Sequence, residues 1–126
     1  IAAMKAGAAA VSAAEIDAFA VEAIWLNAAT NAVTVEAVER DLLADAVPAA
    51  DVILVGDLFY EKPLAERALA WLRRCRDAGL DVLIGDPGRS YLPRAALVEV
   101  CAFEVPVTRE LEDAEIKRTA VWRLKS

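Results

Sequence analysis

The sequence predicts a single α/β domain, residues 1–126, with a mostly parallel sheet and an antiparallel hairpin at its C-terminal end. Short apolar runs rich in β-branched residues alternate with longer segments of helical periodicity, as in sheets whose parallel strands are joined by helices. The last two apolar runs are separated by a short acidic segment, too short for a helical crossover, so we expect them to pair antiparallel. A length of 126 residues suits one domain.

The first third of the chain predicts two strands and one complete helix. The opening residues resemble the end of a helix that Gly7 stops, so we expect the chain to begin inside a domain. The apolar run 9–14 predicts a buried strand that ends in acidic residues. Residues 18–31 predict a helix with a broad buried face and Asp17 as its N-cap, and the valines within 33–41 predict a second strand.

The clearest strand is the β-branched run 51–57, whose continuous hydrophobicity is typical of a strand buried on both faces. Pro63 then suits the first turn of a helix with an apolar stripe, and Gly79 suits its end. Residues 81–85 predict another buried strand. These segments predict a strand–helix–strand unit of the parallel sheet.

The C-terminal third predicts a short helix at 93–100 and the strands 101–108 and 117–124, joined by the acidic segment 110–115. The tryptophans and cysteines of the chain fall at positions where the pattern predicts burial. They are Trp25, Trp71, Trp122, Cys75 and Cys101.

The composition excludes several classes of function. A net charge of −6 argues against a broad electrostatic contact with nucleic acid or with an anionic membrane, so neither is an expected partner. The chain has no histidine, which excludes a Ser-His-Asp triad and a histidine-ligated metal. Its two cysteines are not expected to form a disulfide, and we expect a cytoplasmic location. Neither a secretory signal nor a glycine-rich phosphate loop is recognisable.

Acidic side chains follow the predicted parallel strands at the point where each strand ends. Because ligands of open α/β sheets bind beyond the carboxyl ends of the strands, these acids are candidates for one shared ligand site. The alternative for each acid is a helix N-cap or a solvated loop position. The acids are Glu15 and Asp17, Asp41, Asp57 and Asp86.

Two local motifs stand out. In Gly-Asp-Leu-Phe-Tyr-Glu (56–61), a carboxylate and a phenol three residues apart, Asp57 and Tyr60, can hold an amine; the alternative is a packed aromatic pair beneath a helix start. In Gly-Asp-Pro-Gly-Arg (85–89), glycine and proline preset a tight turn, and Arg89 faces either an acid or a substrate.

Together these motifs resemble the seven-strand protein-lysine methyltransferases, class I enzymes with a Rossmann-like sheet. The resemblance is closest to the electron-transfer-flavoprotein β-subunit lysine methyltransferase family and its bacterial relatives, and more distant to ribosomal-protein lysine methyltransferases. It covers essentially the whole chain in order. The residues that carry it are 13–17, 26–31, 56–61, 83–89 and Thr-Ala-Val-Trp at 119–122.

The resemblance implies S-adenosylmethionine as cofactor and a role for each matching residue. Glu15 would bind the adenosine ribose, Ile16 would lie against the adenine, and Asp41 would lie near the adenine amino group. Asp57 and Tyr60 match the family's Asp-x-x-Tyr element, which lines the target-lysine pocket beside the methionine sulfonium, so Asp57 also counts as a cofactor contact. The family's first strand and Gly-rich loop do not occur in this chain, which predicts a gap in the sheet between the strands ending at Glu15 and Asp57.

The resemblance therefore implies a protein-lysine N-methyltransferase whose partner is a protein substrate, with an electron-transfer flavoprotein subunit as the candidate. Two alternatives stay open from the residues: a methyltransferase that acts on a small-molecule amine, and a non-catalytic methyltransferase-like binding module. The sequence upstream of Ile1 separates the non-catalytic module from the two methyltransferases, since an Asp or Glu followed by glycines at alternate positions there would complete a cofactor site.

Overall fold

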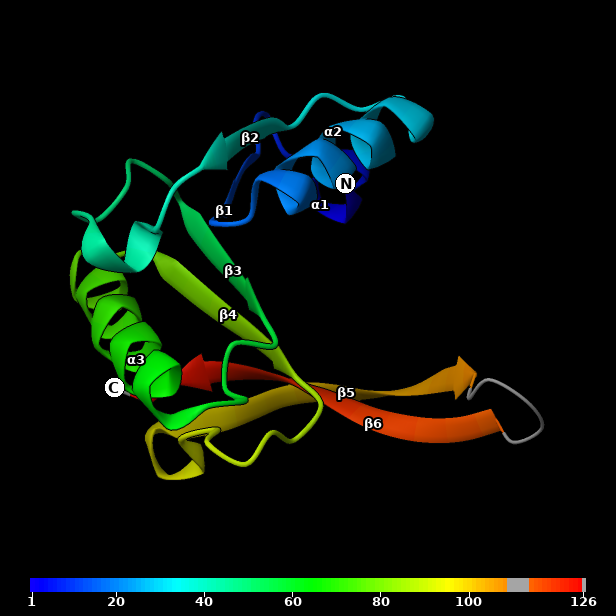
Figure 1. The fold of residues 1–126 in the computed structure, drawn as a ribbon. Helices are drawn as coiled ribbons and strands as arrows, with labels where there is room; N and C mark the ends of the chain where they lie inside the picture. The colour runs from blue at the N-terminus through cyan, green and yellow to red at the C-terminus, as the bar shows by residue number, and fades with distance from the viewer. Residues whose placement is uncertain (109–113, 126) are drawn as a thin grey trace. The chain divides into compact units, whose positions relative to one another are not determined.

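The computed structural model describes residues 1–108 and 114–125, and the chain divides into two compact units, Ile1–Ala46 and Val47–Ser126. Each unit combines helices with strands, as the alternating pattern predicts, and each is described by itself (Figure 1). Among the residues that the structure describes, no helix is both long enough and apolar enough to cross a membrane.

The first unit pairs two short parallel strands beside one helix. Its elements are α1 (Ala2–Lys5), β1 (Ser12–Glu15), α2 (Ala18–Thr30), β2 (Glu36–Glu39) and a 3-10 turn (Leu42–Ala44). The β1–β2 register runs from Ser12 opposite Glu36 to Glu15 opposite Glu39. Asp17 caps α2 as predicted, since its Oδ1 accepts from the amide of Phe19 at 2.9 Å. Gly7, at φ +99°, follows the end of α1 in the left-handed conformation that glycine favours.

The expected broad buried face of α2 is wrong. Only Val21 and Ala28 are buried on this helix, while Phe19 and Leu26 are exposed. Trp25, predicted to be in the core, is 48% exposed. Within this unit, a sheet of two four-residue strands offers too little surface to cover a helix of 13 residues.

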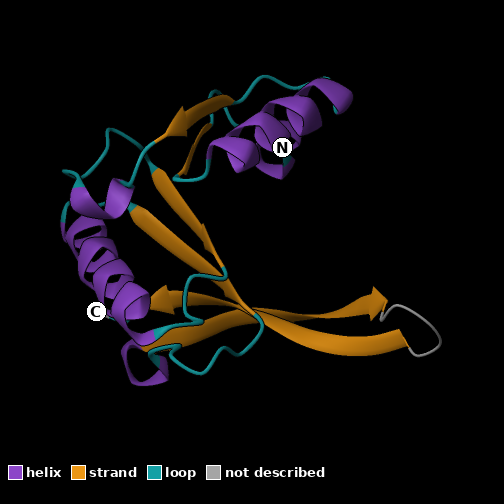
Figure 2. Ribbon diagram, viewed as in Figure 1, coloured by secondary structure: helices purple, strands orange, loops and turns teal. Residues whose placement is uncertain are grey.

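The second unit contains a four-stranded mixed sheet in the order β3-β4-β6-β5. Strands β3 (Val52–Gly56) and β4 (Asp81–Asp86) are parallel and are joined through α3 (Lys62–Asp77). Strands β5 (Leu97–Thr108) and β6 (Ala114–Leu124) form the predicted antiparallel hairpin, and β6 also pairs antiparallel with β4. The helix lies along one face of the β3–β4 pair (Figure 2).

The core of this unit lies between α3 and one face of the sheet. The helix begins with Pro63 in its first turn, as predicted, and buries Ala65, Ala68, Trp71, Leu72 and Cys75. Strand β4 presents Val82 and Ile84 to the same core, and β6 adds Ala120 and Trp122. The predictions of buried Trp71, Trp122 and Cys75 are therefore confirmed.

Three predictions for this unit are wrong. Strand β3 is half-buried on one face only, where Ile53 and Val55 lie; Val52 and Leu54 are exposed on the other face. The short helix expected at 93–100 is a single 3-10 turn, Arg94–Ala96, because β5 already begins at Leu97, where it pairs with Leu124.

The third concerns Cys101, which lies exposed on the hairpin, where no helix covers it; both cysteines are free, as expected. The acidic segment expected to join the hairpin strands, 110–115, falls largely outside the described residues, and Ala114 and Glu115 belong to β6.

Among the described residues, β1 pairs with β2 alone and β3 pairs with β4 alone, so no described strand joins the two sheets. The expected gap between the strands that end at Glu15 and Asp57 stays a prediction.

Candidate active site

The segment after β3 begins with Asp57, a predicted site residue whose backbone has a positive φ. Asp57 follows Gly56, the last residue of β3, and adopts φ +56°, a conformation that non-glycine residues rarely adopt, although Asp tolerates it better than most. Its amide donates to the carbonyl oxygen of Gly85 at 3.1 Å, which ties the turn to the end of β4. Such conformations cluster at functional sites and persist where the surroundings enforce them.

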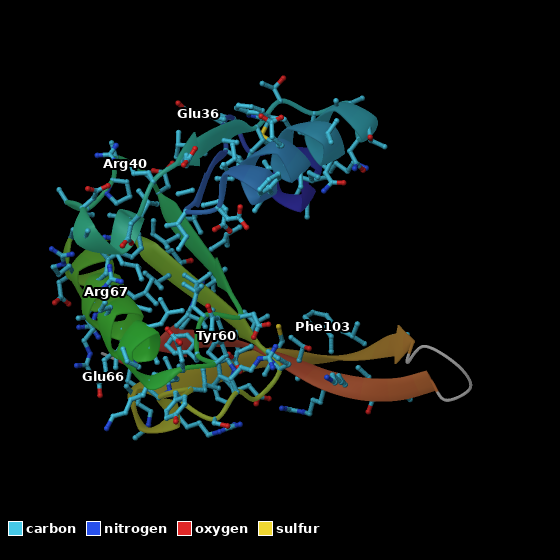
Figure 3. All side chains as sticks on the ribbon, viewed as in Figure 1. Glu36, Arg40, Tyr60, Glu66, Arg67 and Phe103 are labelled. Atoms are coloured by element: carbon cyan, nitrogen blue, oxygen red, sulfur yellow. The ribbon has the colours of Figure 1, made fainter. Side chains whose placement is uncertain are left out.

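The two aromatic residues of this segment behave differently. Phe59 is completely buried, and its carbonyl oxygen accepts from the amide of Tyr91 at 3.2 Å. Tyr60 is 56% exposed and is labelled in Figure 3, in the segment between β3 and α3. Of the two aromatic residues, only Phe59 is packed as the alternative of a buried aromatic pair requires. Tyr60 stays available to a ligand.

The carboxylate of Asp57 forms a bidentate ion pair with Arg89. Nε of Arg89 donates to Oδ1 at 2.5 Å and Nη2 donates to Oδ2 at 2.7 Å, which is the forked geometry that makes arginine–carboxylate pairs directional. The hydrogen bonds from Arg89 hold the pKa of Asp57 below its usual value, and the carboxylate raises the pKa of Arg89 in turn. Both side chains are about half exposed, so solvent reaches the pair.

The turn that carries Arg89 is organised from beneath by a buried carboxylate. Asp86, the last residue of β4, is 1% exposed, and its Oδ1 accepts from the amides of Gly88 and Arg89, both at 2.7 Å. Gly88 adopts φ +96°. Gly88 has no Cβ, which leaves room for the guanidinium of Arg94. A Cβ at this position would lie 3.3 Å from Nη2 of Arg94.

Asp86 is therefore a buried acid, whereas the predicted row of acids allowed for an N-cap, a solvated loop position or a ligand site. The strand alternates, so Asp86 points to the covered face with Val82 and Ile84 rather than to the opposite face with Gly85. Its role in fixing the turn has a sequence signal, because Asp before Pro-Gly is typical of turns in which the side chain accepts amides two and three residues on.

An open apolar hollow of about 390 Å³ lies on the face of the sheet opposite α3. Its lining comes from β3, β4 and β6: Leu54, Val55, Gly56, Leu83, Gly85 and Val121. Gly56, the last residue of β3, lies opposite Gly85, the next-to-last residue of β4, and neither glycine has a side chain to fill this surface next to Asp57. The ends of the strands thus offer a carboxylate beside an apolar surface.

The other predicted site residues lie in the first unit, at the carboxyl ends of β1 and β2. Oε1 of Glu15 accepts from the amides of Ile16 and Asp17 at 2.7 and 3.2 Å, which leaves its Oε2 without a partner within the described residues. Ile16 is 72% exposed. Asp41 follows β2 and caps the 3-10 turn, accepting from the amide of Leu43 at 3.1 Å.

The structure thus places the predicted site residues in two groups. Glu15, Ile16 and Asp41 gather at one strand edge of the first unit, and Asp57 and Tyr60 share one segment of the second. Within the described residues, no hydrogen bond joins the hydroxyl of Tyr60 to Asp57, whose carboxylate is held by Arg89 instead. The sequence left the partner of Arg89 open between an acid and a substrate, and Asp57 is that acid.

Comparison with proteins of known sequence gives relatives along nearly the whole chain. The chain is 34% identical over 129 residues to the electron transfer flavoprotein beta subunit lysine methyltransferase of Danio rerio, with 98% of the chain aligned. It is 31% identical to the corresponding protein of Rattus norvegicus and 30% identical to that of Homo sapiens, with 97% aligned in each case. The chain spans about half the length of these relatives. No family model matches it.

Comparison with solved structures gives methylases. A presumed methylase from Haemophilus influenzae superposes with a TM-score of 0.58 at 14% identity, over 99% of this chain and 78% of that one. An rRNA methylase from Escherichia coli superposes with a TM-score of 0.52 at 18% identity, over 98% and 52%. At such identities the likeness shows the fold alone. By sequence the chain is related to the electron transfer flavoprotein beta subunit lysine methyltransferases, and its α/β fold is that of the methylases, as its motifs predict.

Proposed function

We propose that this chain carries the acceptor site of an S-adenosylmethionine-dependent protein-lysine N-methyltransferase. The observation that carries the proposal is the Asp57-x-x-Tyr60 segment, which follows β3. It combines a carboxylate whose pKa is lowered by Arg89, on a residue with positive φ, with an exposed phenol. Relatives named as lysine methyltransferases align with nearly the whole of this chain. We further propose the electron transfer flavoprotein beta subunit as the protein substrate, because those relatives are named for it.

The residues of the first unit suit the adenosine part of the proposed cofactor. The second carboxylate oxygen of Glu15 can accept protons from the ribose hydroxyls while the first stays on the local amides. Exposed Ile16 offers an apolar surface for a purine face, and Asp41 can accept from an exocyclic amino group. The donors and acceptors present are therefore compatible with the role proposed for each residue.

The chemistry that S-adenosylmethionine supplies is a methyl group bound to a positively charged sulfur. The residues of this chain then have to align a neutral lysine amine with that methyl group and accommodate the charge that develops on nitrogen. Asp57 can accept an N–H of the amine, which turns the nitrogen lone pair away from the carboxylate. Tyr60 can accept or donate a second hydrogen bond to fix the rotation of the amine.

The test is methylation of the purified flavoprotein beta subunit by the native protein that contains this chain, with labelled S-adenosylmethionine and mass spectrometry of the product. We expect label on lysine, and at least tenfold slower transfer by Asp57→Asn, consistent with loss of a positioning contact. Asp51→Asn is the matched control, since Asp51 lies exposed just before β3, at the opposite end of the strand.

Each alternative function has its own outcome in this experiment. Label on free amines but never on protein lysine would favour the small-molecule methyltransferase. Absence of any transfer by a folded protein, together with unchanged binding partners in Asp57→Asn, would favour the non-catalytic binding module. Either outcome contradicts the proposal.

A further inference from the structure

The Asp57–Arg89 pair raises a question about the protonation of the proposed substrate. A lysine side chain in water has a pKa of about 10.4, whereas only its neutral form carries the lone pair that accepts a methyl group. An unpaired carboxylate beside the amine would favour the ammonium form and raise that pKa further. A site that used Asp57 alone would therefore hold its substrate in the unreactive form.

The geometry of the ion pair offers a solution to this conflict. The forked contact from Arg89 occupies one position on each carboxylate oxygen, at 2.5 and 2.7 Å. An ionised carboxylate has about four acceptor positions, so Asp57 can still accept an N–H from an amine while Arg89 stays in place. The paired carboxylate remains a hydrogen-bond acceptor, but its charge is offset by the guanidinium.

We propose that Arg89 is a positioning residue that balances the charge of Asp57, so that the acceptor site favours a neutral amine over an ammonium ion. The inference rests on the function proposed above and adds to it the protonation state that the site selects. Arg89 acts through Asp57 and orients its carboxylate.

Three features of the structure support a built arrangement rather than a chance surface contact. Asp57 is held at φ +56°, which fixes the direction of its side chain. The turn that carries Arg89 is fixed by buried Asp86, which accepts from the amide of Arg89 itself. The partners are 32 residues apart and come from the ends of two adjacent strands, so the sheet register sets their separation.

The other charged groups near the pair do not reverse the effect of Arg89 on the charge of Asp57. Lys117 on β6 adds a weaker attraction for Asp57, in the same sense as Arg89. Asp86 acts on Arg89 from the covered side, but its carboxylate is engaged with the turn amides. Tyr60, in the same segment as Asp57, is exposed. Arg89 is therefore the group whose removal changes the charge at Asp57 most.

The test is the pH dependence of single-turnover methylation by the native protein with Arg89→Gln. Without the guanidinium, the bound lysine should keep its proton to higher pH, so the rising limb of the rate profile should move to alkaline pH. A shift of one pH unit lowers the rate about tenfold near neutral pH, and this loss should shrink towards about pH 10. The KM for the protein substrate should not rise, because an uncompensated carboxylate binds the ammonium form at least as well.

Two further variants separate charge from structure. Arg89→Lys keeps the charge without the fork, so its pH profile should stay close to that of the wild type even if its rate falls. Asp57→Asn with Arg89→Gln removes both charges, so its profile should lack the alkaline shift. Arg73→Gln, on an exposed position of α3, controls for the loss of one positive charge.

The outcomes distinguish this inference from the proposed function. An equal loss of rate at every pH in Arg89→Gln, or an alkaline shift in Arg89→Lys or in the double variant, would overturn the charge-balancing role while leaving the methyltransferase proposal intact. Failure of the wild-type protein to methylate any lysine would overturn the proposed function itself. Should Arg89→Gln fold poorly, by circular dichroism, Arg89→Ala takes its place as the neutral variant, and the same alkaline shift is expected of it.

Discussion

The backbone amide of Arg89 donates to the buried carboxylate of Asp86 at 2.7 Å, so the residue that holds Asp57 is itself held from inside the fold. The same Oδ1 accepts from the amide of Gly88. The buried end of β4 thereby fixes the backbone of one partner of an exposed ion pair. This chain of contacts makes the stability of the turn and the geometry of the site depend on one another.

Removal of the Asp86 carboxylate should destabilise the second unit. Asp86→Ala leaves two amides without their acceptor, and we expect a loss of about 1.5 to 3 kcal/mol in the free energy of unfolding, as for hydrogen bonds to charged groups. Urea denaturation followed by circular dichroism measures this loss. Asp51→Ala, at an exposed position, should change stability by less than about 0.5 kcal/mol. Equal effects of the two substitutions would contradict the role assigned to Asp86.

A methyl group at Gly88 should also be costly. Gly88→Ala places a Cβ in the left-handed conformation and 3.3 Å from Nη2 of Arg94, and we expect destabilisation of about 1 to 2 kcal/mol. Gly56→Ala is the matched control, because Gly56 has no positive φ and a Cβ there meets no atom within 4 Å. Thermal melts of both variants provide the measurement. If Gly88→Ala has the same Tm as Gly56→Ala, the turn is not strained in the way described.

The pH dependence of stability should report the Asp57–Arg89 pair. The pKa of Asp57 lies below its unfolded value of 3.8, so the pair contributes stability above that pH and loses it as the pH falls through the folded pKa. Asn tolerates the positive φ of residue 57, so Asp57→Asn removes the charge without new backbone strain. The difference in Tm between wild type and Asp57→Asn should shrink as the pH falls below 3.8 and the folded protein takes up the proton of Asp57. A difference that does not shrink on acidification would mean that the charge is not its source.

Glu15→Ala should weaken binding of S-adenosylmethionine more than Asp57→Ala does. Loss of a ribose contact to a carboxylate should cost about 1.5 to 3 kcal/mol, or roughly tenfold to a hundredfold in Kd. Calorimetry on the native protein tests this, with Glu22→Ala on the exposed side of α2 as control. Equal affinities in the Glu15 and Asp57 variants would refute the division of roles.

The sequence predicts the elements of this fold better than their burial. Asp17 and Pro63 locate the starts of α2 and α3 because caps and first-turn prolines act locally. The exposure of Trp25 and of one face of β3 could not be predicted in the same way. It depends on which surfaces the described elements cover. Likewise the periodicity of 93–100 allows a helix, and the long register of β5 with β6 decides for a strand.

The site shows the same division between local and long-range information. Asp57 and Tyr60 are recognisable from one short motif, but the choice of Arg89 as the partner of Asp57 depends on the pairing of β3 with β4. The inward direction of Asp86 follows from strand alternation, which is fixed only once the covered face is known. The positions of Glu15 and Asp41 at one edge follow from the parallel register of β1 and β2.

The most direct test of the central claim is single-turnover methylation of the flavoprotein beta subunit by Asp57→Asn, Tyr60→Phe and the double variant of the native protein. If the two residues act together on the amine, each single variant should be slower by roughly tenfold to a thousandfold, the double variant should be little slower than the poorer single variant, and affinity for S-adenosylmethionine should change by no more than a few fold. Transfer at wild-type rates in both single variants would contradict the account, and would leave the segment as the packed start of α3.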